Sequence, residues 1–225
     1  MGQTKDISMT IAHNTYHKKE EILNVITHGI GAILSIPAFI ILMLESYKQG
    51  SISNMLIYMV YGISLMVLYF ASSLYHGVQN PKWRNPLNVW DHISIYILIA
   101  GSYGPFVLIG LHGTVIGWVI FSIVWAFAII GIILKIFYFG KYNILSAIAY
   151  VIMGWIAIIG INTMIEMLPM PALYWLFGGG IAYTVGAILF MFDEKIPYNH
   201  AIFHLLVLVG SACHFYAVYT YLLMA

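Results

Sequence analysis

The sequence predicts an all-α integral membrane protein, built as a bundle of seven transmembrane helices. Two features of the composition support this fold class. Hydrophobic residues make up 62% of the 225 residues and charged residues only 8%, whereas soluble domains carry about 25% charged residues. The third observation is a series of seven apolar runs, each near the ~20 residues that span a bilayer. So much apolar surface requires lipid as its solvent.

The chain divides into a polar N-terminal tail and one transmembrane domain. Residues 1–21 are polar and lack the apolar segment of a signal peptide, so we expect this tail to be retained. Residues 22–225 form the domain, in which short loops should make consecutive helices antiparallel neighbours. The predicted spans are Ile22–Leu44, Met55–His76, Asp91–Ile109, Thr114–Ile133, Ile144–Met164, Leu173–Phe192 and His200–Leu223.

Basic residues set the expected orientation. With seven spans, the tail and the loops after the second, fourth and sixth spans share one side of the membrane. Because cytoplasmic loops carry an excess of basic residues, we expect the N-terminus in the cytoplasm and the C-terminus outside. The other side holds only Lys48, whereas the expected cytoplasmic side holds Lys5, Lys18, Lys19, Lys82, Arg84, Lys135, Lys141 and Lys195.

The rest of the composition narrows the function. The formal net charge is +1 and there is no basic stripe, which argues against a nucleic-acid partner. The single cysteine, Cys213, excludes an internal disulfide framework and a cysteine-rich zinc site. The glycine triplet 178–180 in the sixth span permits the close approach of another helix.

Two histidines open the seventh span. His200 and His204 are four residues apart, so on a helix they share one face and can ligate one metal ion, usually zinc. His76 ends the second span and should reach the same leaflet. Three histidines and a water form a common catalytic zinc shell, so we predict zinc bound by His76, His200 and His204. The alternative is that these histidines only hydrogen-bond neighbouring helices.

Further polar residues should converge on these histidines. Position 201 is alanine, where metalloprotease His-Glu-x-x-His helices have a glutamate base, so Asp91 is the best-placed carboxylate. Asp91 also suits a helix N-cap at the start of the third span, a role compatible with the first. Ser72 lies one turn from His76 and could stabilise an oxyanion. The residues that open the first span on one face, and should surround the ligands, are Glu21, Asn24 and His28.

The remaining histidines are expected to have other roles. His92 should face away from the site, because its neighbour Asp91 takes the inward direction. His214 projects near the direction of His204 but about 15 Å deeper, so we expect it to bond a neighbouring helix. The histidines expected to be solvated are His112 on an external loop and His13 and His17 in the tail.

These residues resemble the motifs of the hemolysin III family, within the wider group of progestin and adiponectin receptor-like proteins. The first motif is Glu21-x-x-Asn24-x-x-x-His28, followed by Gly29. The second is Ser72-x-x-x-His76, with Asp91 as the acidic residue that follows it. The third is Asn199-His200-x-x-x-His204, continuing into Gly210-Ser211. Together the motifs cover nearly the whole chain.

The resemblance implies a seven-helix bundle with a cytoplasmic N-terminus, as in a bacterial plasma-membrane member of the family. It implies zinc held by His76, His200 and His204, with Asp91 contacting the zinc-bound water. Distant similarity to alkaline ceramidases implies hydrolysis of a lipid amide, and the family name comes from haemolytic activity attributed to bacterial members. A role in lipid or energy homeostasis has also been proposed for such proteins.

Three functions therefore stay open. The first is a zinc-dependent hydrolase acting on an amide or ester of a membrane lipid, with Asp91 and Ser72 as catalytic residues. The second is a membrane sensor of lipid or energy homeostasis whose zinc is structural; a closed four-ligand shell would favour it, and an open water position would favour catalysis. The third is a pore-forming cytolysin, against which the multi-span topology argues, because a released toxin must be soluble before insertion.

Overall fold

The computed structural model describes residues 18–138, 143–192 and 196–224, and helices are the only regular elements in these ranges. Seven of the helical segments are long and apolar enough to cross a membrane, which confirms the predicted fold class. The elements are α1 (Lys18–Lys48), α2 (Ile52–Gly77), α3 (Pro81–Gly104) with the π-helical turn η1 (Pro105–Ile109), α4 (Val115–Phe137), α5 (Asn143–Gly154), η2 (Ile156–Gly160), α6 (Ile161–Met167), α7 (Met170–Phe190), and α8 (Asn199–Val218) with η4 (Tyr219–Leu223).

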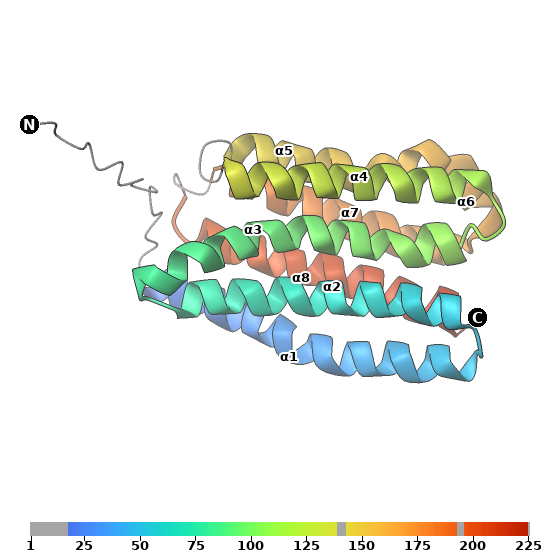
Figure 1. Ribbon diagram of the computed structural model, residues 1–225, viewed down its shortest axis with the longest axis horizontal. Coiled ribbons are helices and arrows are strands. Elements are labelled where there is room, and N and C mark those ends of the chain that lie inside the picture. Colours follow the sequence, from blue (N-terminus) through green and yellow to red (C-terminus); the bar gives the residue numbers. More distant parts are fainter. Residues whose placement is uncertain (1–17, 139–142, 193–195, 225) are drawn as a thin grey trace, which may run out of the picture.

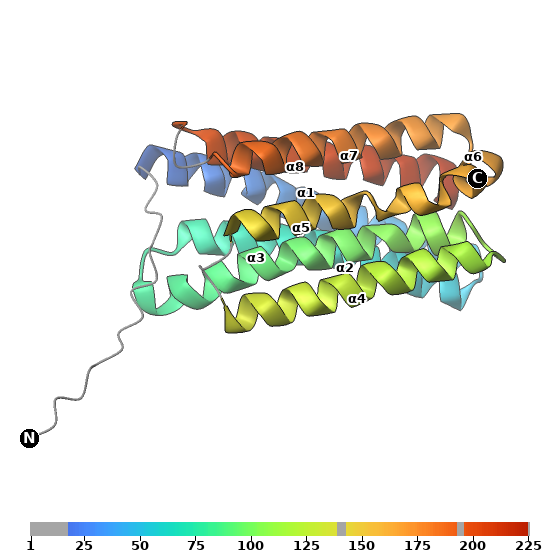
Figure 2. The same cartoon turned by 90° about the horizontal axis from the view of Figure 1, so that it is seen from above.

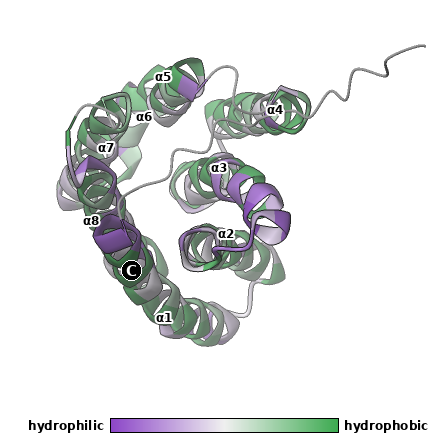
Figure 3. Ribbon diagram, turned by 90° about the vertical axis from the view of Figure 1, so that its left-hand side faces the viewer, coloured by the Kyte–Doolittle hydropathy of each residue, from purple (hydrophilic) through white to green (hydrophobic). Residues whose placement is uncertain are grey.

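The spans form a closed ring. Each span contacts the next one along the chain, and α8 contacts α1. Seen end-on, α1, α8, α7 and α5 form an arc that faces α2 and α3, with α4 outside α3 (Figure 3). The beginning of α1 and the C-terminus lie at opposite ends of the bundle (Figures 1 and 2), as an odd number of spans requires. Exposed isoleucine and leucine side chains cover the outside of the helices, where lipid would surround them.

Helix α3 begins well before the position that the sequence analysis predicted. It starts at Pro81, and the Asn80 side chain caps it by accepting a hydrogen bond from the Lys82 N–H at 3.0 Å. Asp91 therefore lies inside the helix, and its predicted role as an N-cap is wrong. The hydropathy pattern missed this first part because the stretch before Asp91 is polar although helical. Helix α1 begins at Lys18, four residues before the first predicted apolar span.

The fifth span is interrupted in the middle of the bundle. Helix α5 ends at Gly154, and the tighter turns of η2 begin after Trp155. The Tyr103 hydroxyl of α3 replaces the hydrogen bonds lost at the break. It donates to the carbonyls of Met153 at 2.9 Å and Gly154 at 2.8 Å, and it accepts the Ala157 N–H at 3.1 Å. Such a break is tolerated at membrane depth because the freed backbone groups are buried and bonded.

Candidate metal centre

Three buried histidines meet where α2 ends and α8 begins. His76 is the penultimate residue of α2, and His200 and His204 lie on the first turns of α8. Each offers a ring nitrogen, and these nitrogens lie within 4.8 Å of one another. The ring centroids of His200 and His204 are 4.5 Å apart, and each is 5.0 Å from that of His76. The structure thus brings together the three residues that the sequence analysis selected as metal ligands.

A buried carboxylate fixes the orientation of His76. Glu21 Oε2 lies 2.6 Å from His76 Nδ1, and Glu21 Oε1 forms an ion pair with the Arg84 guanidinium. A carboxylate only accepts hydrogen bonds, so Nδ1 carries the proton and Nε2 keeps its lone pair for a metal. The Arg84 guanidinium also donates to the carbonyls of Tyr75 at 3.2 Å and Val78 at 3.1 Å, which holds it in place.

Arg84 was expected to be a cation of the cytoplasmic loop. The side chain is instead buried inside the bundle, beside Glu21. One signal could have found it: Arg84 is the single arginine of the chain, and a carboxylate within an apolar span needs a cationic partner. Arginine suits this position because its planar fork can bond a carboxylate and two carbonyls at once.

Helix α1 also supports His204. The Nδ1 atom of His204 lies 3.4 Å from the Asn24 carbonyl and 3.3 Å from the Thr27 hydroxyl. The carbonyl can only accept, so Nδ1 is the donor and Nε2 is left for a metal, as in His76. The His28 ring stacks on the His204 ring, with centroids 3.6 Å apart and planes 8° from parallel. Thr27 is a second contact that the sequence motifs did not indicate.

Asp91 and Ser72 lie beside the histidines. Asp91 is buried and lines the same cavity as His200 and His204. The Ser72 hydroxyl is buried near the Asp91 carboxyl, without a hydrogen bond of standard geometry to any described residue. Asp91 therefore has the access to the cavity that a general base needs, whereas Ser72 is not among the residues that line it.

The structure corrects the expectation for His92 and confirms the one for His214. His92 does not face away, because it lines the cavity as Asp91 does, and its Nδ1 donates to the Asn88 carbonyl at 2.9 Å. Helix α3 is enclosed by neighbours on most of its circumference, so adjacent residues can both point inward. His214 donates from Nε2 to the Leu176 carbonyl of α7 at 3.0 Å, the predicted bond between helices.

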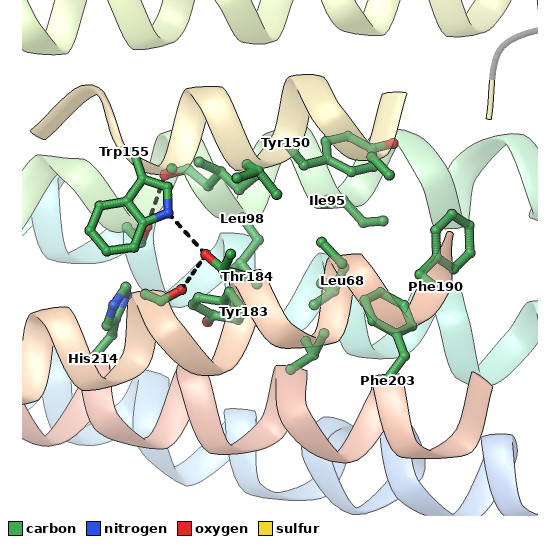
Figure 4. A pocket seen from close by; sticks show the side chains of 18 of the residues that line it. Leu68, Ile95, Leu98, Tyr150, Trp155, Tyr183, Thr184, Phe190, Phe203 and His214 are labelled. Carbon is green, nitrogen blue, oxygen red and sulfur yellow. Dashed lines mark hydrogen bonds between the residues drawn. The ribbon is translucent and has the colours of Figure 1, made fainter. Parts of the chain in front are cut away.

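A cavity of about 120 Å³ runs from the histidines into the bundle. The end of the cavity beside His200 is marked in Figure 4 by Phe190 and Phe203. The ring centroids of these two residues lie 5.8 Å and 5.6 Å from that of His200. Leu68 and Ile95 line the middle, and Trp155 lies at the far end (Figure 4). The cavity therefore joins a polar site of histidines and Asp91 to a long apolar interior.

Comparison with known proteins agrees with the motifs. A family model described as "Haemolysin-III related" matches residues 16–215. The chain is 48% identical to Hemolysin-3 of Bacillus cereus, over 93% of this chain and 94% of that protein. It is 42% identical to a Hemolysin-3 homolog of Bacillus subtilis (strain 168), over 90% of this chain and 94% of the relative. The human Monocyte to macrophage differentiation factor is 28% identical over 90% of this chain and 84% of its own. The chain belongs to the haemolysin III family of membrane proteins.

Proposed function

We propose that this protein is a zinc-dependent hydrolase of the bacterial plasma membrane, which cleaves an amide or ester bond of a membrane lipid. One observation carries the proposal: three buried histidine nitrogens lie within 4.8 Å of one another beside a carboxylate, at the polar end of an apolar cavity. The donor set fits zinc, which takes imidazole nitrogens readily and uses three histidines in catalytic sites. The residues that would hold it are His76, His200 and His204.

The surrounding residues would prepare this donor set. Glu21 and Arg84 keep His76 Nδ1 protonated, and the Asn24 carbonyl does the same for His204, so both rings present Nε2. When bound, zinc would lower the pKa of a coordinated water to about 7 and polarise a carbonyl oxygen. Water would be the nucleophile, as in catalytic zinc sites that hold three protein ligands and one water.

Asp91 would act on the attacking water. Its carboxylate would orient the water and take one proton as the oxygen adds to the carbonyl carbon. The same proton would pass to the departing nitrogen or oxygen when that bond breaks, so a free acid and an amine or alcohol leave. Ser72, buried near Asp91, would hold the carboxylate in position.

The apolar cavity would receive an acyl chain. Its walls between the histidine end and Trp155 are largely hydrocarbon and aromatic, so they favour a chain over water. A lipid whose carbonyl lies at the histidines would thus place its chain inside the bundle. The exclusion of water by that chain would strengthen the electrostatic interactions at the reacting bond.

A combined assay of zinc and turnover tests the proposal. Protein purified in detergent should carry close to one zinc per chain, and His76→Ala, His200→Ala and His204→Ala should each lose most of it. Asp91→Asn should keep the zinc but slow the hydrolysis of N-acyl lipids and lipid esters by about 10²–10⁴-fold, the usual contribution of acid–base catalysis. Zinc is measured by mass spectrometry and turnover by release of the free fatty acid.

Two exposed residues provide matched controls. His112 and Glu166 lie at the other end of the bundle from the histidine cluster. The variants His112→Ala and Glu166→Gln should therefore keep both zinc and activity. Hydrolysis that survives both zinc removal and Asp91→Asn would come from a contaminant and would contradict the proposal. Bound zinc without turnover of any lipid class would instead favour a sensor with structural zinc.

The names of the two Bacillus relatives favour a second candidate, haemolysis. The same preparation can be added to erythrocytes to separate the two functions. Lysis that is independent of zinc and of Asp91, together with no lipid turnover, would support the second candidate over the hydrolase.

A further inference from the structure

The far end of the cavity is a second polar site, built by four different spans. Tyr103 comes from α3, Trp155 from the break after α5, Thr184 from α7 and His214 from α8. Trp155 and His214 lie at this end, away from Phe190 (Figure 4). Polar side chains are costly inside a membrane bundle and tend to mark functional sites.

Three of these four side chains use their polar atoms on protein partners. Trp155 Nε1 donates to Thr184 Oγ1 at 2.9 Å, and Thr184 donates to the Gly180 carbonyl at 2.7 Å. The Tyr103 hydroxyl is occupied by the backbone of the helix break, as described above. These bonds fix the shape of the far end and leave its fourth polar side chain, His214, as the group with an unused atom.

His214 presents a hydrogen-bond acceptor. Its Nε2 must be the protonated nitrogen, because the Leu176 carbonyl beside it can only accept. In the neutral imidazole Nδ1 is then an acceptor, and this atom is buried without a hydrogen bond to any described residue. The residue His214 is only 8% exposed. A buried acceptor without a donor is unfavourable, so a ligand that brings an O–H group would be bound there more tightly.

The distance from the histidine cluster sets where that O–H group must lie. His204 and His214 are ten residues apart on one helix, which corresponds to about 15 Å at 1.5 Å per residue. The cavity wall between them includes Leu68, Ile95 and Leu98, which offer no polar side-chain atom. Because an extended alkyl chain is a zigzag, each bond advances it by only about 1.25 Å, so roughly a dozen bonds cover this distance.

We propose that the far end of the cavity binds a hydroxyl group, through His214 Nδ1, and thereby selects lipids whose acyl chain carries a hydroxyl about a dozen carbons from the carbonyl. The inference rests on the proposed function for the position of the carbonyl at the histidine cluster. The hydroxyl-binding site itself rests on the cavity and on His214.

Equilibrium binding of fatty acids tests this site without requiring turnover. Radiolabelled ω-hydroxydodecanoic acid and dodecanoic acid are bound to the full chain in detergent, and unlabelled acid corrects for uptake by the micelles. We expect the ω-hydroxy acid to bind roughly three- to tenfold more tightly, the effect of one neutral hydrogen bond. An isomer with its hydroxyl at the middle of the chain should bind more weakly than dodecanoic acid, because that group would be buried against apolar walls.

Two variants of His214 separate its two nitrogens. His214→Gln can keep the bond to the Leu176 carbonyl, because the glutamine amide nitrogen reaches the place of Nε2, but it offers no acceptor at the place of Nδ1. His214→Asn can place its amide oxygen, a hydrogen-bond acceptor, near the position of Nδ1, but it loses the bond to the Leu176 carbonyl. The preference for the ω-hydroxy acid, taken as the ratio of the two affinities within each variant, should disappear in His214→Gln and be kept in His214→Asn.

The outcomes distinguish this inference from the proposed function. Equal binding of the two acids by the wild type, or no binding of either, would overturn the hydroxyl site, as would a preference that survives in His214→Gln. A preference that is lost in His214→Gln supports the site even if no lipid is hydrolysed, in which case only the hydrolase proposal fails.

Discussion

At the scale of single residues, the ion pair of Glu21 and Arg84 gives the histidine cluster its rigidity. A carboxylate buried alone would cost several kcal/mol of desolvation, so it needs both a cation and hydrogen bonds. Glu21 has both, because one oxygen pairs with Arg84 and the other accepts the proton of His76 Nδ1. The charge of Glu21 thus makes His76 a better electron donor and holds its ring in one orientation.

Replacing the carboxylate tests this role. We expect Glu21→Gln to weaken zinc binding by about 10–100-fold, the usual effect of losing a residue that orients a metal ligand. The affinity is measured by competition with a chelator of known zinc affinity. Glu45→Gln is the matched control, because Glu45 pairs with Lys48 at the other end of the bundle. Equal zinc affinity of Glu21→Gln and the wild type would show that His76 does not need this carboxylate.

At the scale of helices, Gly179 allows a close approach of α7 to α8. The sequence indicated the triplet 178–180, and the structure singles out its middle member. A Cβ atom added at Gly179 would lie 2.4 Å from His214 Cδ2 and 3.0 Å from the Gly210 carbonyl oxygen. A Cβ at Gly178 would have no atom within 4 Å. Small residues in membrane helices have this use, since they let two backbones pack closely.

An alanine scan of the triplet measures this contact. Gly179→Ala should destabilise the protein by about 1–3 kcal/mol, because the Gly210 backbone and the His214 ring must move to admit the methyl group. The temperature of half-maximal aggregation in detergent should fall by roughly 2–10 °C. Gly178→Ala, with open space around its Cβ, should change it little. The same loss of stability in both variants would contradict a specific close approach at Gly179.

At the scale of the whole molecule, the buried charged groups of the described residues gather at one end of the bundle. The start of α8 and the connection from α2 to α3, which carry much of the hydrophilic colour in Figure 3, lie at that end. Two of the cations used to predict the orientation are buried rather than in loops: Arg84 pairs with Glu21, and Lys135 donates to the Asn143 side chain at 3.1 Å. The exposed Lys18, Lys19 and Lys82 still favour this end as the cytoplasmic one.

Labelling of introduced cysteines tests this orientation. In a variant whose single cysteine, Cys213, is replaced by serine, Lys82→Cys should react with a membrane-impermeant thiol reagent only after cell lysis. His112→Cys, which is exposed at the opposite end, should react in intact cells. The degree of labelling is read from a mass shift on a gel. The reverse pattern would place the histidine cluster in the outer leaflet and would contradict the predicted orientation.

The sequence by itself determined the number of spans and which residues meet at one end of the bundle. Hydropathy over about 20 residues is a local property, so it identifies a span without knowledge of its neighbours. Short loops then make successive spans antiparallel, and this alternation alone brings His76 at the end of one span to the level of His200 and His204 at the start of another. The spacing of four residues placed the last two on one helix face.

Only the tertiary structure decided how these helices are rotated and which distant side chains pair. The bond between Glu21 and Arg84 joins residues far apart in sequence, so no local pattern contains it. The polar first part of α3 is helical because Asn80 caps it and Arg84 anchors it to Glu21 of α1, so Asp91 lies in the helix interior and not at its start. The break at Trp155 is likewise stable because Tyr103, on another helix, bonds the freed backbone groups. Packing and long-range hydrogen bonds, which depend on the whole bundle, decided these features.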